Sequence, residues 1–213
     1  MTPAPAAGES ETARQLEQAE REDAGRGLEF VWVDLEGGYQ YVALQGLHSN
    51  GLLDGSALGD SGSGFALGAG AGVRVIFLTI GARFRLNQTS DWNLWTLGGE
   101  VGLHLPYGAL EPSFTLGVGY AALANVGGDA AAGLDTGAID VAGVDARLGA
   151  NLDYYINPLL SFGARGSVEV LALWRSSSPQ PEAVSAATAA VYGRDGSGIG
   201  IGVALSAVAG LHF

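Results

Sequence analysis

Bulky apolar residues alternate with small or polar residues along much of this sequence, and this alternation constrains the fold more than any other feature. In residues 144–158, VDARLGANLDYYINP, Arg147 and Asn151 fall on one side, whereas Leu148 and Leu152 fall on the other. Since successive side chains of a β-strand point to opposite faces, the pattern predicts a strand with one polar and one apolar face. The stretch is also longer than the typical strand of about five or six residues.

The same alternation recurs in eight segments that are joined by links of unequal length. The predicted strands cover approximately residues 28–44, 64–75, 77–88, 94–105, 110–122, 144–157, 160–174 and 198–213. Links near 76, 106–109 and 158–159 are short and alternate with the links 45–63, 89–93, 123–143 and 175–197, of which only 89–93 is short. The long links are rich in Gly, Ser, Asp and Ala, as loops are. The sequence therefore predicts an all-β, up-and-down antiparallel barrel with one end of short turns and one of long loops.

The apolar and polar faces suit opposite sides of such a barrel. A barrel of eight strands has an interior only wide enough for side chains to fill, and the thirty or so bulky residues of the apolar face would crowd it. The opposite face is rich in glycine, which weakens a strand exposed to water but leaves room for long Arg and Glu side chains inside. We therefore predict a closed transmembrane β-barrel with the apolar face in lipid. A soluble barrel with that face inside remains the alternative.

Aromatic residues support the membrane alternative because they gather near the strand ends, as in the interfacial girdles of membrane barrels. Tyr107, Tyr154, Phe162 and Phe213 lie toward the end with short turns. A second group lies toward the long loops and comprises Tyr41, Trp92, Trp95, Tyr120 and Trp174.

In strand number, loop asymmetry and terminal strand, ALSAVAGLHF, the chain resembles the eight-stranded outer-membrane β-barrel proteins of Gram-negative bacteria, such as the OmpA, OmpX and OmpW groups. The resemblance covers residues 28–213 and is architectural, without a motif of one family. It implies a bacterial outer-membrane location. It also implies contact with outer-membrane lipid and lipopolysaccharide, and a C-terminal signal at Leu211 and Phe213 that the barrel-assembly machinery reads.

The N-terminal segment differs in composition from the predicted barrel. Residues 9–25 are rich in Glu, Gln, Arg and Ala and contain Leu16 as their one large apolar residue, so they have little face to bury. We predict a helical or disordered periplasmic arm over residues 1–27, followed by the barrel at 28–213. No secretory leader is visible in the sequence, so an exported protein would have lost one.

Charged residues on the glycine-rich face are expected to pair inside the lumen, because an unpaired charge in a low-dielectric interior costs several kcal/mol. The predicted network comprises Asp34, Glu36, Arg74, Arg83, Arg85, Glu100, His104, Glu111, Arg147, Asp153, Arg165 and Glu169. Pairing across the short turns is expected to place Asp153 opposite Arg165, Arg147 near Glu169, His104 near Glu111 and Arg83 near Glu100. Asp34 and Glu36 are expected to reach arginines across the lumen. The alternative is that lumen water solvates these side chains.

The sequence gives no pattern for catalysis, a cofactor or a metal. Cysteine is absent, which excludes disulfides. The net charge of −12 argues against the binding of nucleic acid, which is itself negatively charged. His48, His104 and His212 do not form a zinc or Ser/His/Asp pattern. Five acidic residues of the predicted loops could bind calcium but lack the spacing of a calcium loop, and they are Asp54, Asp60, Asp129, Asp135 and Asp140.

The function expected from these features is non-enzymatic. We predict a small, porin-like outer-membrane protein with a structural or interaction role in the cell envelope, and with its loops and periplasmic arm as contact surfaces for an envelope protein partner. One alternative is a narrow channel or carrier for small solutes. The other is a lipid-modifying enzyme, which some barrels of this size are, although no serine–histidine pair suits a site on the outer face or rim.

Overall fold

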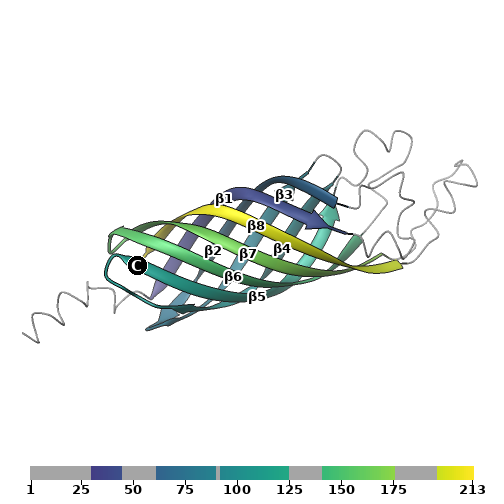
Figure 1. Ribbon diagram of the computed structural model, residues 1–213. Coiled ribbons are helices and arrows are strands. Elements are labelled where there is room, and N and C mark those ends of the chain that lie inside the picture. Colours follow the sequence, from purple (N-terminus) through teal and green to yellow (C-terminus); the bar gives the residue numbers. More distant parts are fainter. Residues whose placement is uncertain (1–29, 45–60, 90–91, 125–140, 176–195) are drawn as a thin grey trace, which may run out of the picture.

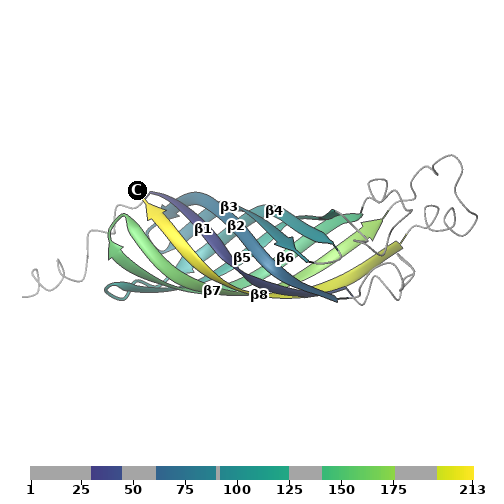
Figure 2. The ribbon, with the colours of Figure 1, turned by 90° about the horizontal axis from the view of Figure 1, so that it is seen from above.

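The protein folds into a closed barrel of eight antiparallel β-strands (Figure 1). The computed structural model describes residues 30–44, 61–89, 92–124, 141–175 and 196–213. The strands are β1 Val31–Ala43, β2 Ser61–Val75, β3 Leu78–Gln88, β4 Asn93–His104, β5 Leu110–Ala124, β6 Val141–Asn157, β7 Leu160–Arg175 and β8 Gly196–His212. Each strand pairs with its neighbour in sequence and β8 pairs with β1, which closes the cylinder (Figure 2). This confirms the predicted fold class.

Three tight links define one end of the barrel, called the turn end below. Two residues, 76 and 77, join β2 to β3, and Gly108 with Ala109 forms the turn between β4 and β5. Gly108 has a φ of 61°, a left-handed conformation that glycine adopts without steric cost. Between β6 and β7, the side-chain oxygen of Asn157 accepts hydrogen bonds from the backbone N–H groups of the next turn. At the opposite end, the loop end, the strands connect through residues outside the described ranges.

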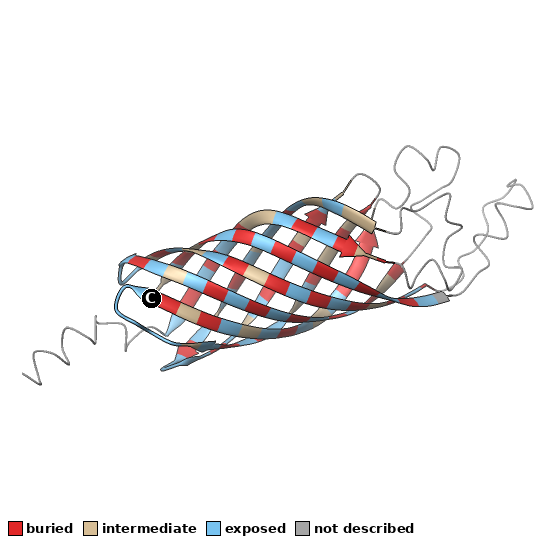
Figure 3. Ribbon diagram, in the orientation of Figure 1, coloured by how far each residue is buried: buried red, intermediate tan, exposed pale blue. Residues whose placement is uncertain are grey.

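The faces of the strands are oriented as predicted. Leu148 is 62% exposed on the outer surface, whereas its neighbour Arg147 is 8% exposed in the lumen, and this alternation runs along the strands (Figure 3). Every Asp, Glu and Arg of the described strands is buried or half-buried, and none is exposed. The outer surface of these strands is therefore free of ionisable carboxylates and guanidiniums. Within the described part of the chain, no helix has the length and apolar character needed to cross a membrane.

The aromatic residues of the turn end lie on the outer surface, and one residue assigned to the other girdle does not. Tyr41, Tyr120 and Trp174 are exposed as predicted, and Trp95 is half-buried against Tyr120, with ring centroids 5.4 Å apart. Trp92 is only 1% exposed, so its placement in the outer girdle was wrong. It shares the inward phase of β4, because it lies an even number of residues before the lumenal residues of that strand.

The seam between the first and last strands completes the barrel at the turn end. The carbonyl of Phe213 accepts hydrogen bonds from the backbone N–H groups of Phe30 and Val31, at 2.7 and 3.0 Å. The backbone N–H of Phe213 donates to the carbonyl of Val31 at 2.8 Å. The predicted N-terminal arm, residues 1–27, lies outside the described residues.

Candidate functional site: a layered lumen

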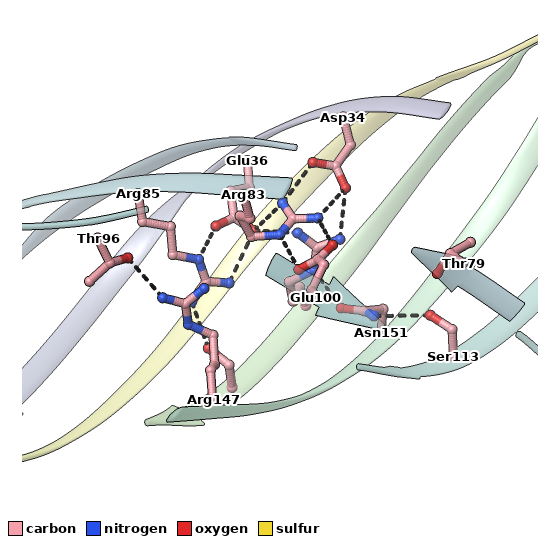
Figure 4. Close-up of polar contacts among 12 residues, drawn as sticks. Asp34, Glu36, Thr79, Arg83, Arg85, Thr96, Glu100, Ser113, Arg147 and Asn151 are labelled. Atoms are coloured by element: carbon pink, nitrogen blue, oxygen red, sulfur yellow. Dashed lines mark hydrogen bonds and ion pairs between the residues drawn. The ribbon is translucent and has the colours of Figure 1, made fainter. Parts of the chain in front are cut away.

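The middle of the lumen is filled by a set of paired charges, called the central charge cluster below. Its members are Asp34, Glu36, Arg83, Arg85, Glu100, Asp145, Arg147, Arg165 and Glu169. They come from five of the eight strands, because inward positions of β1, β3, β4, β6 and β7 converge at the same depth (Figure 4). The lumen is narrow enough that side chains from opposite walls meet.

Arg83 lies between two carboxylates and binds both in a bidentate manner (Figure 4). Its guanidinium donates to Glu100 at 2.6 and 2.7 Å, and to Asp34 at 2.7 and 2.8 Å. Paired N–H groups that match the two oxygens of a carboxylate give the strongest side-chain ion pairs. Gly70 makes this approach possible, because a Cβ there would lie 2.7 Å from Arg83 and 2.9 Å from Asp34.

Arg165 and Arg85 connect the first strand to the other walls. Arg165 donates to Glu36 at 2.5 Å and to Asp34 at 2.8 Å, across the lumen from β7 to β1. Arg85 donates two hydrogen bonds to Glu36, and a third to Ser167 at 2.9 Å. The structure thus brings Asp34 and Glu36 to arginines across the lumen, as the sequence suggested, and shows which arginines they are.

Arg147 joins the cluster to the loop-end half of the lumen. It lies directly across the strand pair from Glu169, with an Nε–Oε2 distance of 3.4 Å. It also donates to Asp145 at 3.0 Å and to Thr96 at 2.8 Å. Glu169 accepts a further hydrogen bond from the side-chain amide of Gln40. The pairing of Arg147 and Glu169 therefore follows from the register of β6 and β7.

Asp153 does not lie opposite Arg165, and this expected register was wrong. Asp153 pairs with Gly163, whereas Asn151 pairs with Arg165 and accepts its Nε–H at 2.5 Å. An irregularity between Tyr155 and Asn157 shifts the register by one residue next to the turn, and without it Asp153 would lie opposite Ala164, still not opposite Arg165. A bulge of this kind carries no clear mark in the sequence.

A second polar group, called the turn-end cluster below, surrounds the fully buried carboxylate of Glu111. Arg74 donates to both of its oxygens, at 2.8 and 2.9 Å, and His104 Nδ1 lies 2.8 Å from Oε1. Tyr155 donates to the same oxygen at 3.3 Å. The contact of His104 with Glu111 was expected from the sequence, whereas Arg74 and Tyr155 were not assigned to it. Their common inward phase was visible, but the strand tilt that brings them together was not.

Each histidine of the turn end also contacts a hydroxyl group. Thr79 Oγ1 lies 3.2 Å from His104 Nε2, and Ser161 Oγ lies 2.9 Å from His212 Nε2. The sequence did not pair these residues, because they are far apart in the chain. Both pairs lie inside the lumen, and the described residues contain no group of three or more His, Asp or Glu side chains arranged to hold a metal ion.

Apolar side chains fill the lumen at the loop end, in a layer called the apolar collar below. None of its members is more than 5% exposed, and they are Val42, Leu44, Trp92, Leu94, Leu123, Val141, Leu171 and Leu173. Leu44 reaches across to β8, where a Cβ on Gly200 would lie 2.8 Å from it and 3.5 Å from Leu171. The sequence analysis did not identify this layer. Near these strand ends both faces are apolar, so the alternation no longer separates inside from outside.

Replacement of Arg147 and Glu169, singly and together, tests whether the two side chains interact directly in the lumen. We expect Arg147→Met and Glu169→Gln each to lower the free energy of unfolding. The double variant should lose less than the sum of the two single losses, by a coupling energy of about 0.5–3 kcal/mol. The measurement is the urea dependence of unfolding of each variant in lipid vesicles. Fully additive losses would show that lumen water, and not the partner, solvates each charge.

Comparison with known proteins gives matches in structure but not in sequence. No protein-family model matches the sequence, and no curated protein has a matching sequence. Neisserial surface protein A (NspA) superposes with a TM-score of 0.56 at 13% identity, over 86% of this chain and 97% of that chain. The outer membrane protein AlkL, solved in DMPC bilayers, gives 0.52 at 14% identity, over 100% and 95%. OprG of Pseudomonas aeruginosa gives 0.50 at 12% identity, over 88% and 98%.

These matches agree with the architecture derived above. The chain has the fold of the eight-stranded outer-membrane β-barrels, which confirms the resemblance stated from its sequence. At 12–14% identity the likeness concerns the fold alone.

Proposed function

We propose that this protein is a non-enzymatic barrel of the bacterial outer membrane with a closed lumen, which anchors its loops and its N-terminal arm as contact surfaces in the cell envelope. The observation that carries the proposal is the filling of the lumen by two successive layers. The central charge cluster occupies the middle, and the apolar collar lies between it and the loop end. A barrel of this width has no space beside such side chains for a continuous water-filled path.

The outer surface supports the location. Strands whose exposed faces are apolar and whose charges all lie inside are compatible with hydrocarbon, and closure pairs the backbone groups of every strand. Leu211 and Phe213 are exposed on the outer face of the last strand, 46% and 60% respectively, where a barrel-assembly machinery can contact them. In this proposal the outer surface of the barrel contacts outer-membrane lipid and lipopolysaccharide.

The location is tested by fractionation and by gel mobility. We expect the protein, expressed with a secretory leader in a Gram-negative host, to sediment with the outer membrane. Unboiled samples should migrate differently from boiled samples, because a closed barrel resists unfolding in detergent. Recovery in the soluble periplasmic fraction would overturn the proposal.

A conductance measurement tests the closed lumen against the channel alternative. We expect the purified barrel to show no steady ion current in a planar bilayer with 1 M KCl. At this ionic strength the Debye length is about 3 Å, so surface charge has little effect on the measurement. Vesicles that contain the same amount of a large porin serve as the control for insertion. Steady unitary currents from this protein would favour the narrow channel.

A lipid-modifying activity has less support. In the described strands, the Ser161–His212 and Thr79–His104 pairs both point into the lumen, away from the lipid-facing surface. Mass spectrometry of lipid A after overexpression is the corresponding test, and a mass shift would contradict the non-enzymatic assignment.

A further inference from the structure

The barrel ends in an exposed apolar rim at the turn end. The rim comprises the three turns and the residues that flank them, which are residues 75–78, 105–110 and 156–160. These ranges contain no Asp, Glu, Lys, Arg or His, and their only polar side chains are those of Tyr107 and Asn157. Large apolar side chains of the rim are exposed, among them Ile76 by 68%, Phe77 by 51% and Leu159 by 56%. Contiguous exposed apolar side chains indicate a contact surface.

Hydrogen bonds within the protein reach into all three turns. In each turn a carbonyl accepts from a backbone N–H of a neighbouring strand. These bonds run from His104 to Phe77 at 2.7 Å, from Tyr155 to Ala109 at 2.9 Å and from His212 to Leu159 at 3.0 Å. Two turn positions are the prolines Pro106 and Pro158, which have no N–H to satisfy. Backbone groups paired inside the protein are what a nonpolar surrounding requires.

The length of the β2–β3 hairpin places its turn at the edge of the hydrocarbon. β3 has 11 residues, and a strand needs about 9–11 residues to cross a bilayer. At the loop end of this hairpin, the outward side chains of Ser63 and Gln88 are polar and exposed, which marks that edge. Nearly all of β3 is then needed for the crossing. Leu78 therefore falls within the hydrocarbon, and the turn before it falls at the border.

Ile76 shows that this turn holds an apolar side chain against the preference of its backbone. Its φ is 58°, a left-handed conformation that is an outlier for a β-branched residue. Two-residue hairpin turns with a positive φ normally use Gly, Asn or Asp there. Arg74 secures the turn from the lumen, because its Nε–H donates to the carbonyl of Ile76 at 3.0 Å. A strained residue of this kind points to a function for its side chain.

We infer that the apolar rim inserts into the boundary between acyl chains and headgroups of the surrounding lipid leaflet, and does not project into water. The inference rests on the proposed membrane location and extends lipid contact from the strands to the turns. Ile76, Phe77 and Leu159 contact acyl chains. Tyr107, which is 82% exposed and carries a hydroxyl, lies among the headgroups.

A protein partner is the other surrounding that could cover the rim, and lipid fits better. The rim continues the lipid-facing surface without a polar break, since Val75 and Leu78 are exposed on either side of the β2–β3 turn. Protein interfaces combine an apolar centre with hydrogen bonds and a polar edge. The rim offers no charged side chain for such contacts.

Spin labels on single cysteines test the inference, because the native chain contains no cysteine. Full-length Phe77→Cys and Leu159→Cys carry a nitroxide and are reconstituted into phosphatidylcholine vesicles. Leu148→Cys, at the middle of β6, is the lipid control, and Gln88→Cys, at the loop end of β3, is the water control. Electron paramagnetic resonance measures how often each label collides with oxygen, which concentrates in lipid. It also measures collisions with a water-soluble nickel chelate that is present on both sides of the membrane.

We expect the labels at Phe77 and Leu159 to collide with the nickel chelate several-fold less often than the label at Gln88, and to stay accessible to oxygen. Collision with nickel as frequent as at Gln88 would overturn the inference. So would low accessibility to both reagents, which indicates protein contact, or protection of Gln88, which would place the rim beyond the lipid. If Leu148 is also open to nickel, the membrane location itself fails. Gel mobility verifies folding, and Leu105→Cys replaces a rim variant that does not fold.

Discussion

Replacement of Arg83 by methionine is expected to lower the free energy of unfolding by about 3–5 kcal/mol, as removal of one partner from a buried ion pair does. Methionine retains much of the side-chain volume, so the loss reports on charge and hydrogen bonding. The Arg83 side chain is 2% exposed and binds the 8% exposed Glu100 and the 10% exposed Asp34. Without the guanidinium, both carboxylates would remain in the lumen without their main donor.

Unfolding by urea in lipid vesicles measures this loss, with the gel mobility of folded and unfolded forms as the readout. Tryptophan fluorescence is less suitable, because the Arg83 guanidinium lies over the Trp32 ring at 5.7 Å. Adding Glu100→Gln and Asp34→Asn to the Arg83→Met variant should recover part of the stability, since neutral amides cost less to bury than carboxylates. A loss below about 1 kcal/mol would instead match the range of solvent-exposed ion pairs, and would mean that lumen water solvates the cluster.

The fold was predictable because alternation is a local property of the chain. A residue such as Leu148 faces lipid and Arg147 faces the lumen whatever the strand order is, so the phase of β6 can be assigned from the sequence. The strand bounds follow in the same way, because Gly- and Asp-rich links interrupt the pattern. Where both faces of the strands are apolar, the alternation does not distinguish the lumen from the outer surface. Trp92 was therefore assigned to the wrong face, and the apolar collar was not identified.

Lumenal contacts between two strands of one hairpin could be predicted from the sequence, whereas contacts between more distant strands could not. Arg147 and Glu169 lie opposite each other in the β6–β7 hairpin, so the position of the turn was enough to predict that they are close. The partners of Arg165 on β1 depend on the tilt and stagger of the closed barrel, which no single hairpin specifies. Asp153 illustrates the limit within one hairpin, because an error of one residue at the turn and a one-residue irregularity next to it together place Gly163, and not Arg165, opposite it.

The orientation of the apolar face has the second large expected effect, measured with Leu148→Arg. Leu148 lies at the middle of β6 and is 62% exposed on the outer surface. If that surface contacts hydrocarbon, an arginine there is expected to cost about 2–4 kcal/mol of folding free energy, the range for the midplane of a bilayer. In water the same change at an exposed strand position would have little effect, because surface substitutions stay within about 0.5 kcal/mol.

Two matched variants isolate the cause of the loss. Leu148→Ala removes the same apolar contacts without adding charge, and Tyr107→Arg places the charge on an 82% exposed residue at the turn end. The latter should cost only about 0–1 kcal/mol, because the penalty for charge falls toward the membrane interface. Unfolding in vesicles gives all three values. Equal stabilities of Leu148→Arg and Leu148→Ala would show that water reaches the middle of β6, and would remove the physical basis for placing this barrel in a membrane.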